Sequence, residues 1–260
     1  MKVVLFCGGF GTRLREYSET IPKPLVEIGY RPIIWHLMKY YAHFGHTDFI
    51  LALGYRGDLI KDYFLRYNEC MSNDFVLSDG GKQVELLSSD IDDWRITFCD
   101  TGLNSNIGQR LVRVREFLGD DEVFLANYSD GLSDVPLDRQ LADMQRNGSV
   151  ASFASVRPSY SLSAVETDED GVVTGIRYMS DADVRINGGF MILRTDIFDY
   201  IGEGEELVEE PFGRLIDEKK LSAYQYDGFW AAMDTFKDKI MFDRMHGRNE
   251  RPWEVWPNGT

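Results

Sequence analysis

Cysteine is scarce in this chain of 260 residues, which has three cysteines, far apart and with no C-x-x-C pair. An odd number at such spacing argues against a disulfide framework or a cysteine-based zinc site, and it is typical of reduced thiols in the cytoplasm. The four histidines form no H-E-x-x-H pattern, so a common signature of zinc enzymes is absent as well. We therefore expect a cytoplasmic protein whose fold depends on its hydrophobic core.

Long apolar runs and an excess of positive charge are also missing. No apolar run approaches the length of about 18 residues that a membrane-spanning helix needs, and the chain begins with a strand-like segment instead of a signal peptide. The 43 Asp and Glu residues outnumber the 28 Lys and Arg residues, which gives a net charge of −15. This charge argues against nucleic acid and against a membrane surface as partners. To bind a polyanionic small molecule, such a chain must concentrate its cations locally, and we expect a divalent metal to help.

The first strong signal is a glycine-rich loop after an apolar segment. Residues 3–7 predict a buried strand, and a group of glycine, hydroxyl and cationic residues follows it: Gly8, Gly9, Gly11, Thr12 and Arg13. Glycines let the backbone approach a ligand, and exposed N–H groups in such a turn bind anions. Arg13 adds a fork of donors for phosphate oxygens, and Lys23 lies between two prolines on a stiff segment. Together these residues predict a triphosphate site.

Other glycine-rich motifs fit this loop less well. The dinucleotide fingerprint G-x-G-x-x-G needs a third glycine in register, and the P-loop needs a lysine directly after its last glycine. Neither feature is present after Gly8. A tight strand-to-loop turn without any ligand is the remaining alternative, and the two cations Arg13 and Lys23 count against it.

Strand-like and helix-like segments alternate through most of the chain. Apolar runs predict strands at 3–7, 48–53, 122–127, 150–156 and 221–226. Helical periodicity predicts helices at 32–45, 58–67, 111–118, 137–145, 207–218 and 236–245. Shorter runs at 75–77, 83–87 and 94–98 and a hairpin over 165–178 add further strands. This alternation predicts an α/β fold with a parallel sheet covered by helices.

Two aspartates stand at the ends of apolar segments. Asp130 follows the predicted strand 122–127, and ligands of open α/β sheets bind beyond the carboxyl ends of strands. Asp234 ends the aromatic run 228–233, where a buried carboxylate needs a partner such as a metal ion. The plain alternatives are an Asp-Gly turn for Asp130 and support of a helix cap at Thr235 for Asp234.

Five segments together make the chain resemble the sugar-1-phosphate nucleotidylyltransferases. They are 8–14 (GGFGTRL), 22–24 (PKP), 128–131 (YSDG), 187–190 (NGGF) and 230–235 (WAAMDT). Weaker matches favour the glucose-1-phosphate cytidylyltransferase branch, and the resemblance runs from residue 1 to about residue 256. It implies a Rossmann-like three-layer α/β sandwich with a mixed, mostly parallel central sheet. Because no linker interrupts the chain, we expect a nucleotidyltransferase domain over 1–235 and a C-terminal helical appendage of the same domain over 236–260.

The resemblance implies transfer of CMP from CTP to glucose 1-phosphate or a related phosphate acceptor, with release of pyrophosphate. In that reaction Arg13 contacts the β- and γ-phosphates, and Lys23 holds the α-phosphate beside the acceptor phosphate. Asp130 and Asp234 bind Mg2+, the expected cofactor. The nucleotide-binding residues that it implies are Leu5, Cys7, Gly8, Gly9, Gly11, Thr12, Arg13, Lys23, Thr101, Gly108 and Ser129.

The acceptor side departs from the family pattern. The family's Glu-Lys pair, whose lysine binds the sugar phosphate, is missing from the segment 175–180, where Arg177 is the nearest cation. The expected acceptor-binding residues are Arg110, Arg177, Arg185, Asn187 and Gly188. A guanidinium fork asks for a different anion geometry than a lysine does. The acceptor could therefore be a modified sugar phosphate, another small phosphate or a phosphonate.

Several alternatives remain open from the sequence. UTP or dTTP is an alternative to CTP, because no single residue selects the base. The protein could also be a catalytically silent, nucleotide-binding regulatory paralogue, although its retained cations and carboxylates count against that. For Arg110, a solvated helix face is an equal alternative to a contact with a ligand. Because relatives commonly assemble, we expect a homo-oligomer.

Overall fold

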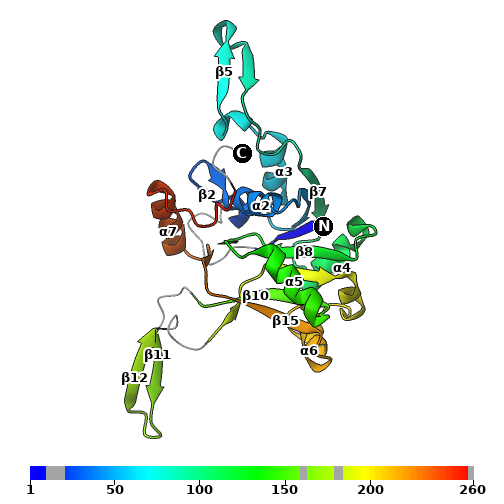
Figure 1. Cartoon of the computed structure of the whole chain (residues 1–260), viewed down its shortest axis with the longest axis vertical. Helices are drawn as coiled ribbons and strands as arrows, with labels where there is room; N and C mark the ends of the chain where they lie inside the picture. The colour runs from blue at the N-terminus through cyan, green and yellow to red at the C-terminus, as the bar shows by residue number, and fades with distance from the viewer. Residues whose placement is uncertain (10–20, 159–162, 179–183, 257–260) are drawn as a thin grey trace.

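The computed structural model describes residues 1–9, 21–158, 163–178 and 184–256 (Figure 1). Its centre is an eight-stranded sheet with the strand order β13-β10-β14-β8-β1-β4-β7, in which β15 also pairs with β10. In chain order these strands are Val3–Cys7 (β1), Asp48–Leu53 (β4), Arg95–Asp100 (β7), Val123–Tyr128 (β8), Ala151–Val156 (β10), Ile186–Asn187 (β13), Met191–Arg194 (β14) and Leu221–Tyr226 (β15).

Parallel pairs dominate the middle of this sheet. β1 pairs in parallel with β4 and with β8, β4 pairs in parallel with β7, and β10 does so with β15. The short strand β14 runs antiparallel to both β8 and β10, and β13 runs antiparallel to β10. The predicted mixed, mostly parallel sheet is therefore confirmed.

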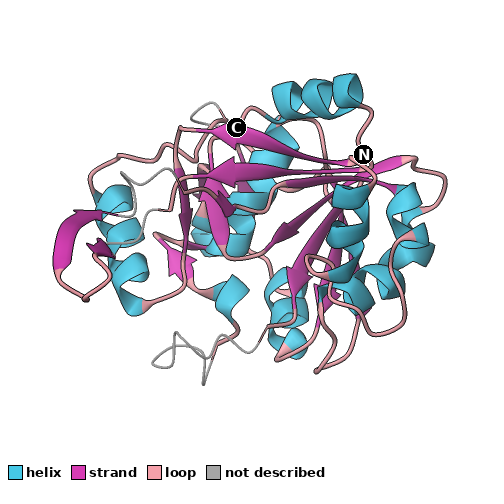
Figure 2. Ribbon diagram, turned by 90° about the horizontal axis from the view of Figure 1, so that it is seen from below, coloured by secondary structure: helices cyan, strands magenta, loops and turns pink. Residues whose placement is uncertain are grey.

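Helices cover both faces of the sheet (Figure 2). They are Ile33–His43 (α2), Gly57–Leu65 (α3), Ile107–Leu118 (α4), Leu137–Asn147 (α5), Glu210–Asp217 (α6) and Phe236–Gly247 (α7). All five residues of β1 are buried, and they alternate between two hydrophobic cores. Leu5 packs in the same core as Leu37 of α2, whereas Phe6 packs in the same core as Leu111 of α4. A strand buried on both faces is expected in a parallel sheet between two helical layers, so the three-layer sandwich is confirmed.

Among the described residues, four two-stranded ribbons lie outside the central sheet. Two lie close to the body: Glu27–Ile28 (β2) with Arg31–Pro32 (β3), and Gly131–Ser133 (β9) with Trp230–Ala232 (β16). Two project from it at opposite ends of the molecule (Figure 1): Phe75–Ser78 (β5) with Gln83–Leu86 (β6), and Ser163–Thr167 (β11) with Val173–Tyr178 (β12). The second of these is the hairpin predicted over 165–178.

The C-terminal segment packs into the body. Thr235 caps α7, because its hydroxyl accepts from the backbone N–H of Asp238 and the Asp238 carboxylate accepts from the Thr235 N–H. This is the cap predicted at Thr235. Farther along the chain, the Trp253 side chain is fully buried against Phe229 and Phe242.

The predicted helix over 207–218 begins later than expected. α6 starts at Glu210, because Leu207 is fully buried in the core beneath α4 and Pro211 occupies the first turn of the helix. Proline is well tolerated there and nowhere deeper in a helix. The loop before α6 therefore lies against α4, which has consequences for the site.

Candidate functional site

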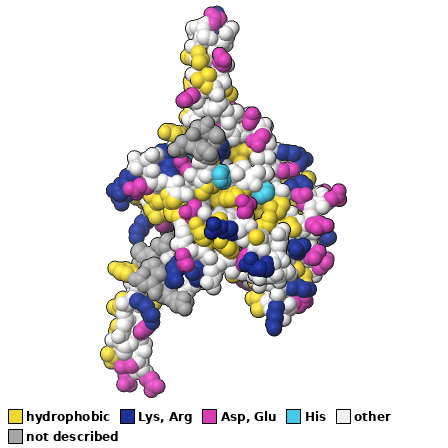
Figure 3. Space-filling model, in the orientation of Figure 1, with side chains coloured by type: hydrophobic (Ala, Val, Ile, Leu, Met, Phe, Trp, Pro, Cys, Tyr) yellow, Lys and Arg dark blue, Asp and Glu magenta, His cyan; other side chains and the backbone are white. Residues whose placement is uncertain are grey.

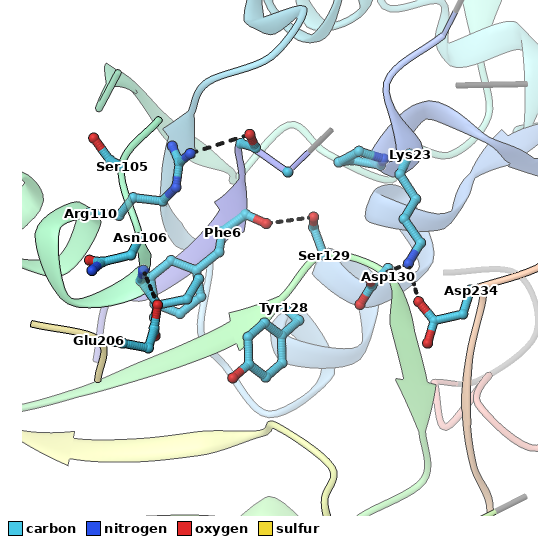
Figure 4. A pocket seen from close by; sticks show the side chains of 14 residues that line it. Phe6, Lys23, Ser105, Asn106, Arg110, Tyr128, Ser129, Asp130, Glu206 and Asp234 are labelled. Atoms are coloured by element: carbon cyan, nitrogen blue, oxygen red, sulfur yellow. Dashed lines mark hydrogen bonds and ion pairs between the residues drawn. The ribbon is translucent and has the colours of Figure 1, made fainter. Parts of the chain in front are cut away.

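A cavity of about 310 Å3 opens at the carboxyl ends of β1 and β8, where ligands of such sheets bind (Figure 4). Residues from six separate parts of the chain line it. They are Phe6, Gly8, Gly9, Lys23, Pro24, Ser105, Asn106, Ile107, Arg110, Tyr128, Ser129, Asp130, Glu206 and Asp234.

Lys23 lies at one end of the cavity between two carboxylates. Its ammonium nitrogen is 2.6 Å from Asp130 Oδ2 and 2.6 Å from Asp234 Oδ1. Burial disfavours the ammonium form, but the negative charge of Asp130 and the hydrogen bonds to both aspartates outweigh this and raise the Lys23 pKa. The lysine is therefore firmly cationic at this end of the cavity.

Two backbone features bring these three residues together. Lys23 stands in a short 3-10 helix, Lys23–Leu25 (η2), directly after Pro22. Asp130 and Asp234 are 104 positions apart in the chain. Asp130 directly precedes β9 and Asp234 closely follows β16, and the antiparallel pairing of these two strands brings the aspartates together. The Met233 N–H also donates to the Asp130 carbonyl at 2.8 Å. The pairing of two three-residue strands thus creates the carboxylate pair.

The wall formed by Gly8 is held by Arg110. The guanidinium group donates to the Gly8 carbonyl at 3.2 Å, to the Leu53 carbonyl at 3.1 Å and to Thr101 Oγ1 at 2.5 Å. A Cβ atom on Gly8 would lie 2.1 Å from Arg110 Nη1, so any other residue there would push the guanidinium group out of this position. Arg110 is 4% exposed, and the alternative of a solvated helix face is therefore wrong.

Ser129 connects the two central strands below the cavity. Its hydroxyl donates to the Phe6 carbonyl at 2.7 Å, across the pair formed by β1 and β8. The rings of Phe6 and Tyr128 lie beside it, with centroids 6.1 Å apart. Burial and the negative charges of Glu206 and Asp130 raise the pKa of the Tyr128 phenol to about 12.

The end of the cavity opposite Lys23 is formed by the start of α4. Asn106 caps this helix, and Ser105, Asn106 and Ile107 line the cavity together with Glu206 (Figure 4). The Ile107 N–H donates to Glu206 Oε2 at 3.2 Å. The loop before α6 comes this close because Gly108 has no side chain: a Cβ atom there would lie 2.3 Å from the Glu205 carbonyl oxygen.

The structure brings seven of the predicted site residues to the cavity. They are Gly8, Gly9, Lys23, Arg110, Ser129, Asp130 and Asp234. Leu5 and Cys7 are instead buried within β1, Thr101 lies behind Arg110, and Gly108 packs against the loop before α6. Gly11, Thr12 and Arg13 lie outside the described residues.

The residues predicted to bind the acceptor, apart from Arg110, do not line this cavity within the described part of the chain. Arg177 forms an ion pair with Glu166 on the projecting ribbon of β11 and β12. Arg185 binds the Ser155 and Tyr226 carbonyls and pairs with Asp227. The Asn187 side-chain oxygen accepts a hydrogen bond from the Gly189 N–H. The Gly188 carbonyl accepts one from Trp230 Nε1–H.

Sequence reasoning missed part of the lining. Seven lining residues were not among the predicted site residues: Phe6, Pro24, Ser105, Asn106, Ile107, Tyr128 and Glu206. Tyr128 directly precedes Ser129 and Asp130, and Ser105 to Ile107 lie between the predicted nucleotide-binding residues Thr101 and Gly108, so position alone could have suggested them. Glu206 carries no local signal, because only the packing of its loop against α4 brings it to the cavity.

Comparison with known proteins identifies the class. The sequence profile of the family described as "Nucleotidyl transferase" matches residues 2–230, and the chain belongs to that family. The predicted resemblance is confirmed, and the protein is a nucleotidyltransferase. None of the helices among the described residues is long and apolar enough to cross a membrane.

Individual relatives narrow the class. The chain is 36% identical over 258 residues to glucose-1-phosphate cytidylyltransferase of Salmonella typhi, a match that covers 98% of this chain and 100% of that protein. It is 37% identical over the same length to a Bacillus subtilis (strain 168) protein named "Probable glucose-1-phosphate cytidylyltransferase", again with 98% and 100% covered. Among solved structures, UDP-glucose pyrophosphorylase complexed with UDP-glucose has a TM-score of 0.69 at 18% identity and covers 95% of this chain and 98% of that one. This last likeness confirms the fold.

Proposed function

We propose that the protein transfers CMP from CTP to glucose 1-phosphate or a closely related phosphate, giving a CDP-sugar and pyrophosphate. The observation that carries this proposal is the convergence of Lys23, Asp130 and Asp234 at one end of the cavity. The full-length similarity to a cytidylyltransferase of 36% identity supports the choice of nucleotide and acceptor.

In the proposed reaction, an oxygen of the acceptor phosphate attacks the α-phosphorus of CTP. The bond between the α-phosphorus and the oxygen that bridges to the β-phosphate breaks, and pyrophosphate leaves. The acceptor phosphate is already ionised, so no general base is required. Lys23 binds the α-phosphate and the acceptor phosphate and offsets the repulsion between the two anions. We assign Arg13 to the β- and γ-phosphates, as the family resemblance implies.

For Asp130 and Asp234 we propose a bound Mg2+. Both carboxylates reach the same ammonium group at 2.6 Å, so a cation in that place would be bound by both. Within the described ranges, no group of three or more His, Cys, Asp and Glu side chains is arranged to hold a metal. The remaining ligands would thus be phosphate oxygens and water, a ligand set that suits Mg2+. Asp130 and Asp234 would hold the ion, which would supply positive charge to the triphosphate, and Lys23 would then bind the phosphates.

The role of Arg110 in this proposal is to position the loop. Each terminal nitrogen of its guanidinium group already donates to oxygens of the protein, Gly8 and Leu53 carbonyls among them. We therefore propose that Arg110 fixes the Gly8 wall against the nucleotide, and that Ser129 does the same for the Phe6 backbone.

A second candidate acceptor is a small phosphate or phosphonate that is not a hexose phosphate. The observation that favours it is the engagement of Arg177 with Glu166 and of Arg185 with Asp227, neither of which lines the cavity. Neither of these two arginines is therefore placed to replace the lysine that binds the sugar phosphate in the family. The chemistry at the α-phosphorus would be unchanged. A silent regulatory paralogue is less well supported, since Lys23 and both aspartates are retained.

We also propose that residues 1–235 carry the chemistry, with 236–260 as a helical appendage, and that the protein is a homo-oligomer. The ribbon of β5 and β6 supports assembly. Phe75 faces Leu86 and Leu77 faces Val84 across it, and all four side chains are at least 40% exposed (Figure 3). A two-stranded ribbon with an uncovered apolar face is marginally stable alone, and a second copy of the chain would cover it.

The experiment that decides between these candidates measures pyrophosphate release for four NTPs against a panel of acceptors. The panel contains glucose 1-phosphate, other sugar phosphates, small non-sugar phosphates and phosphonates, each with Mg2+. We expect release with CTP, and the acceptor that gives the highest kcat/KM identifies the substrate class. Binding of CTP without release for any acceptor would favour the silent paralogue.

A further inference from the structure

The cavity has two chemically different ends (Figure 4). Lys23, Asp130 and Asp234 form one end, where the proposed function places the phosphates and their cation. Asn106 and Glu206 belong to the other end, at the start of α4. A nucleotide is ordered triphosphate, ribose, base, so the end of the cavity remote from Lys23 meets the base.

Glu206 presents a carboxylate at this remote end. Its Oε2 accepts from the Ile107 N–H at 3.2 Å, and its Oε1 accepts from the Leu207 N–H at 3.0 Å. Each carboxylate oxygen has two acceptor positions, so each can accept one more hydrogen bond. The side chain is half-buried, lines the cavity and offers no donor when ionised. Whatever meets Glu206 must therefore bring an N–H or O–H group.

We propose that Glu206 selects the base of the nucleotide by accepting a hydrogen bond from the 4-amino group of cytosine. This inference rests on the proposed function, because it assumes that the phosphates lie at the Lys23 end. Cytosine carries an amino donor at position 4, whereas uracil and thymine carry a carbonyl oxygen there. The carboxylate attracts the amino group and repels the carbonyl oxygen, so Glu206 favours CTP over both UTP and dTTP.

The helix beside Glu206 stabilises the negative charge of the carboxylate at this position. The N–H groups at the start of α4, which have no carbonyl partner within the helix, and the positive end of the helix dipole stabilise a negative charge. The same contact gives Glu206 a purely structural alternative, in which it only caps α4. A cap would act equally on all nucleotides, and this difference makes the two roles separable.

The test compares binding of CTP, UTP and dCTP, measured by calorimetry with Mg2+ and without an acceptor, in the wild type and in Glu206→Gln. The glutamine oxygen can still accept from Ile107 N–H, so the helix start keeps a partner. We expect the ratio of CTP affinity to UTP affinity to fall about tenfold or more, since one base contact is worth roughly this factor. The matched control, Glu203→Gln, removes the same charge from an exposed position three residues earlier and leaves the ratio unchanged.

Three results would overturn the inference. Equal losses of CTP and UTP affinity in Glu206→Gln would assign the residue to the helix cap alone. A changed ratio of CTP to dCTP with an unchanged ratio of CTP to UTP would assign it to the ribose. If the wild type bound CTP and UTP with equal affinity, there would be no base selectivity for Glu206 to provide. Because binding is measured without turnover, failure to release pyrophosphate would count against the proposed function and not against the role of Glu206.

Discussion

Lys23 is a cation held within a cavity of a chain whose net charge is −15. Its side chain is 13% exposed, and two aspartates hold its ammonium group at 2.6 Å, so the positive charge stays in the cavity although the surroundings are acidic. The same carboxylates fit a divalent cation. This cluster of three side chains therefore places one cation in the cavity, beside the two carboxylates that we propose to bind Mg2+.

At the same scale, Arg110→Lys is expected to weaken both the fold and the nucleotide site. A lysine ammonium cannot reproduce the planar fork that bonds to Gly8, Leu53 and Thr101, and at least one buried oxygen loses its partner. We expect the free energy of unfolding to fall by about 1–3 kcal/mol, with a loss of CTP affinity. Urea unfolding and calorimetry measure the two effects.

Arg113→Lys is the matched control for Arg110→Lys, since Arg113 lies exposed on the same helix. It should leave both quantities unchanged. If the two variants behaved alike, Arg110 would not be holding the Gly8 wall.

The central residues were predictable because their signals are local. Gly8, Lys23, Asp130 and Asp234 each stand beside a strand end, a proline or an apolar run that marks them in the sequence. Glu206 has no such mark, and its place depends on Leu207 being pulled into the core and on Gly108 leaving room.

At the scale of elements, the sheet and most helices follow from periodicity, whereas the short pairings do not. β9 and β16 have three residues each, too few to show a pattern, yet they bring Asp130 and Asp234 together. Arg177, predicted to bind the acceptor, lies away from the cavity for a related reason. Arg177 stands on a ribbon whose direction depends on tertiary structure, and there it pairs with Glu166.

α2 and the C-terminal segment meet at His36, which predicts a dependence of stability on pH. Burial lowers the pKa of His36 from 6.5 to about 4. The unfolded chain therefore binds the proton first as pH falls, and the stability held above pH 6.5 is lost between about pH 6.5 and pH 4. The expected loss from this group is about 3 kcal/mol.

His36→Gln isolates that contribution, because a glutamine amide can still donate to the Ile28 carbonyl but does not titrate. Unfolding by urea at pH 7, 5.5 and 4 should give a shallower loss of stability for the variant than for the wild type. Identical pH profiles would show that His36 is not held neutral in the folded state.

At the scale of the whole molecule, the projecting ribbons predict assembly. Leu77→Asp places a charge on the apolar face of the β5–β6 ribbon, opposite Val84, and should shift the protein toward a monomer in light scattering after size-exclusion chromatography. Glu85→Gln lies on the other face and should leave the assembly intact. A wild type that is already monomeric, or a Leu77→Asp variant of unchanged mass, would contradict this role.

The three-layer fold could be predicted as a whole, because alternating helices and strands and a buried β1 allow few other arrangements. The projection of the two ribbons from the body could not be predicted, since the sequence of their short strands does not indicate how the ribbons are oriented relative to the sheet.

The most direct test of the proposed role of Lys23 is the rate of pyrophosphate release from CTP, Mg2+ and the preferred acceptor in the wild type and in Lys23→Ala. We expect release by the wild type and a rate lower by about 100-fold or more in the variant, the usual cost of losing a positioned charge at the reacting phosphate. CTP binding at the Glu206 end should persist in the variant. A wild type that releases no pyrophosphate with any acceptor, or a Lys23→Ala variant as fast as the wild type, would contradict that role of Lys23.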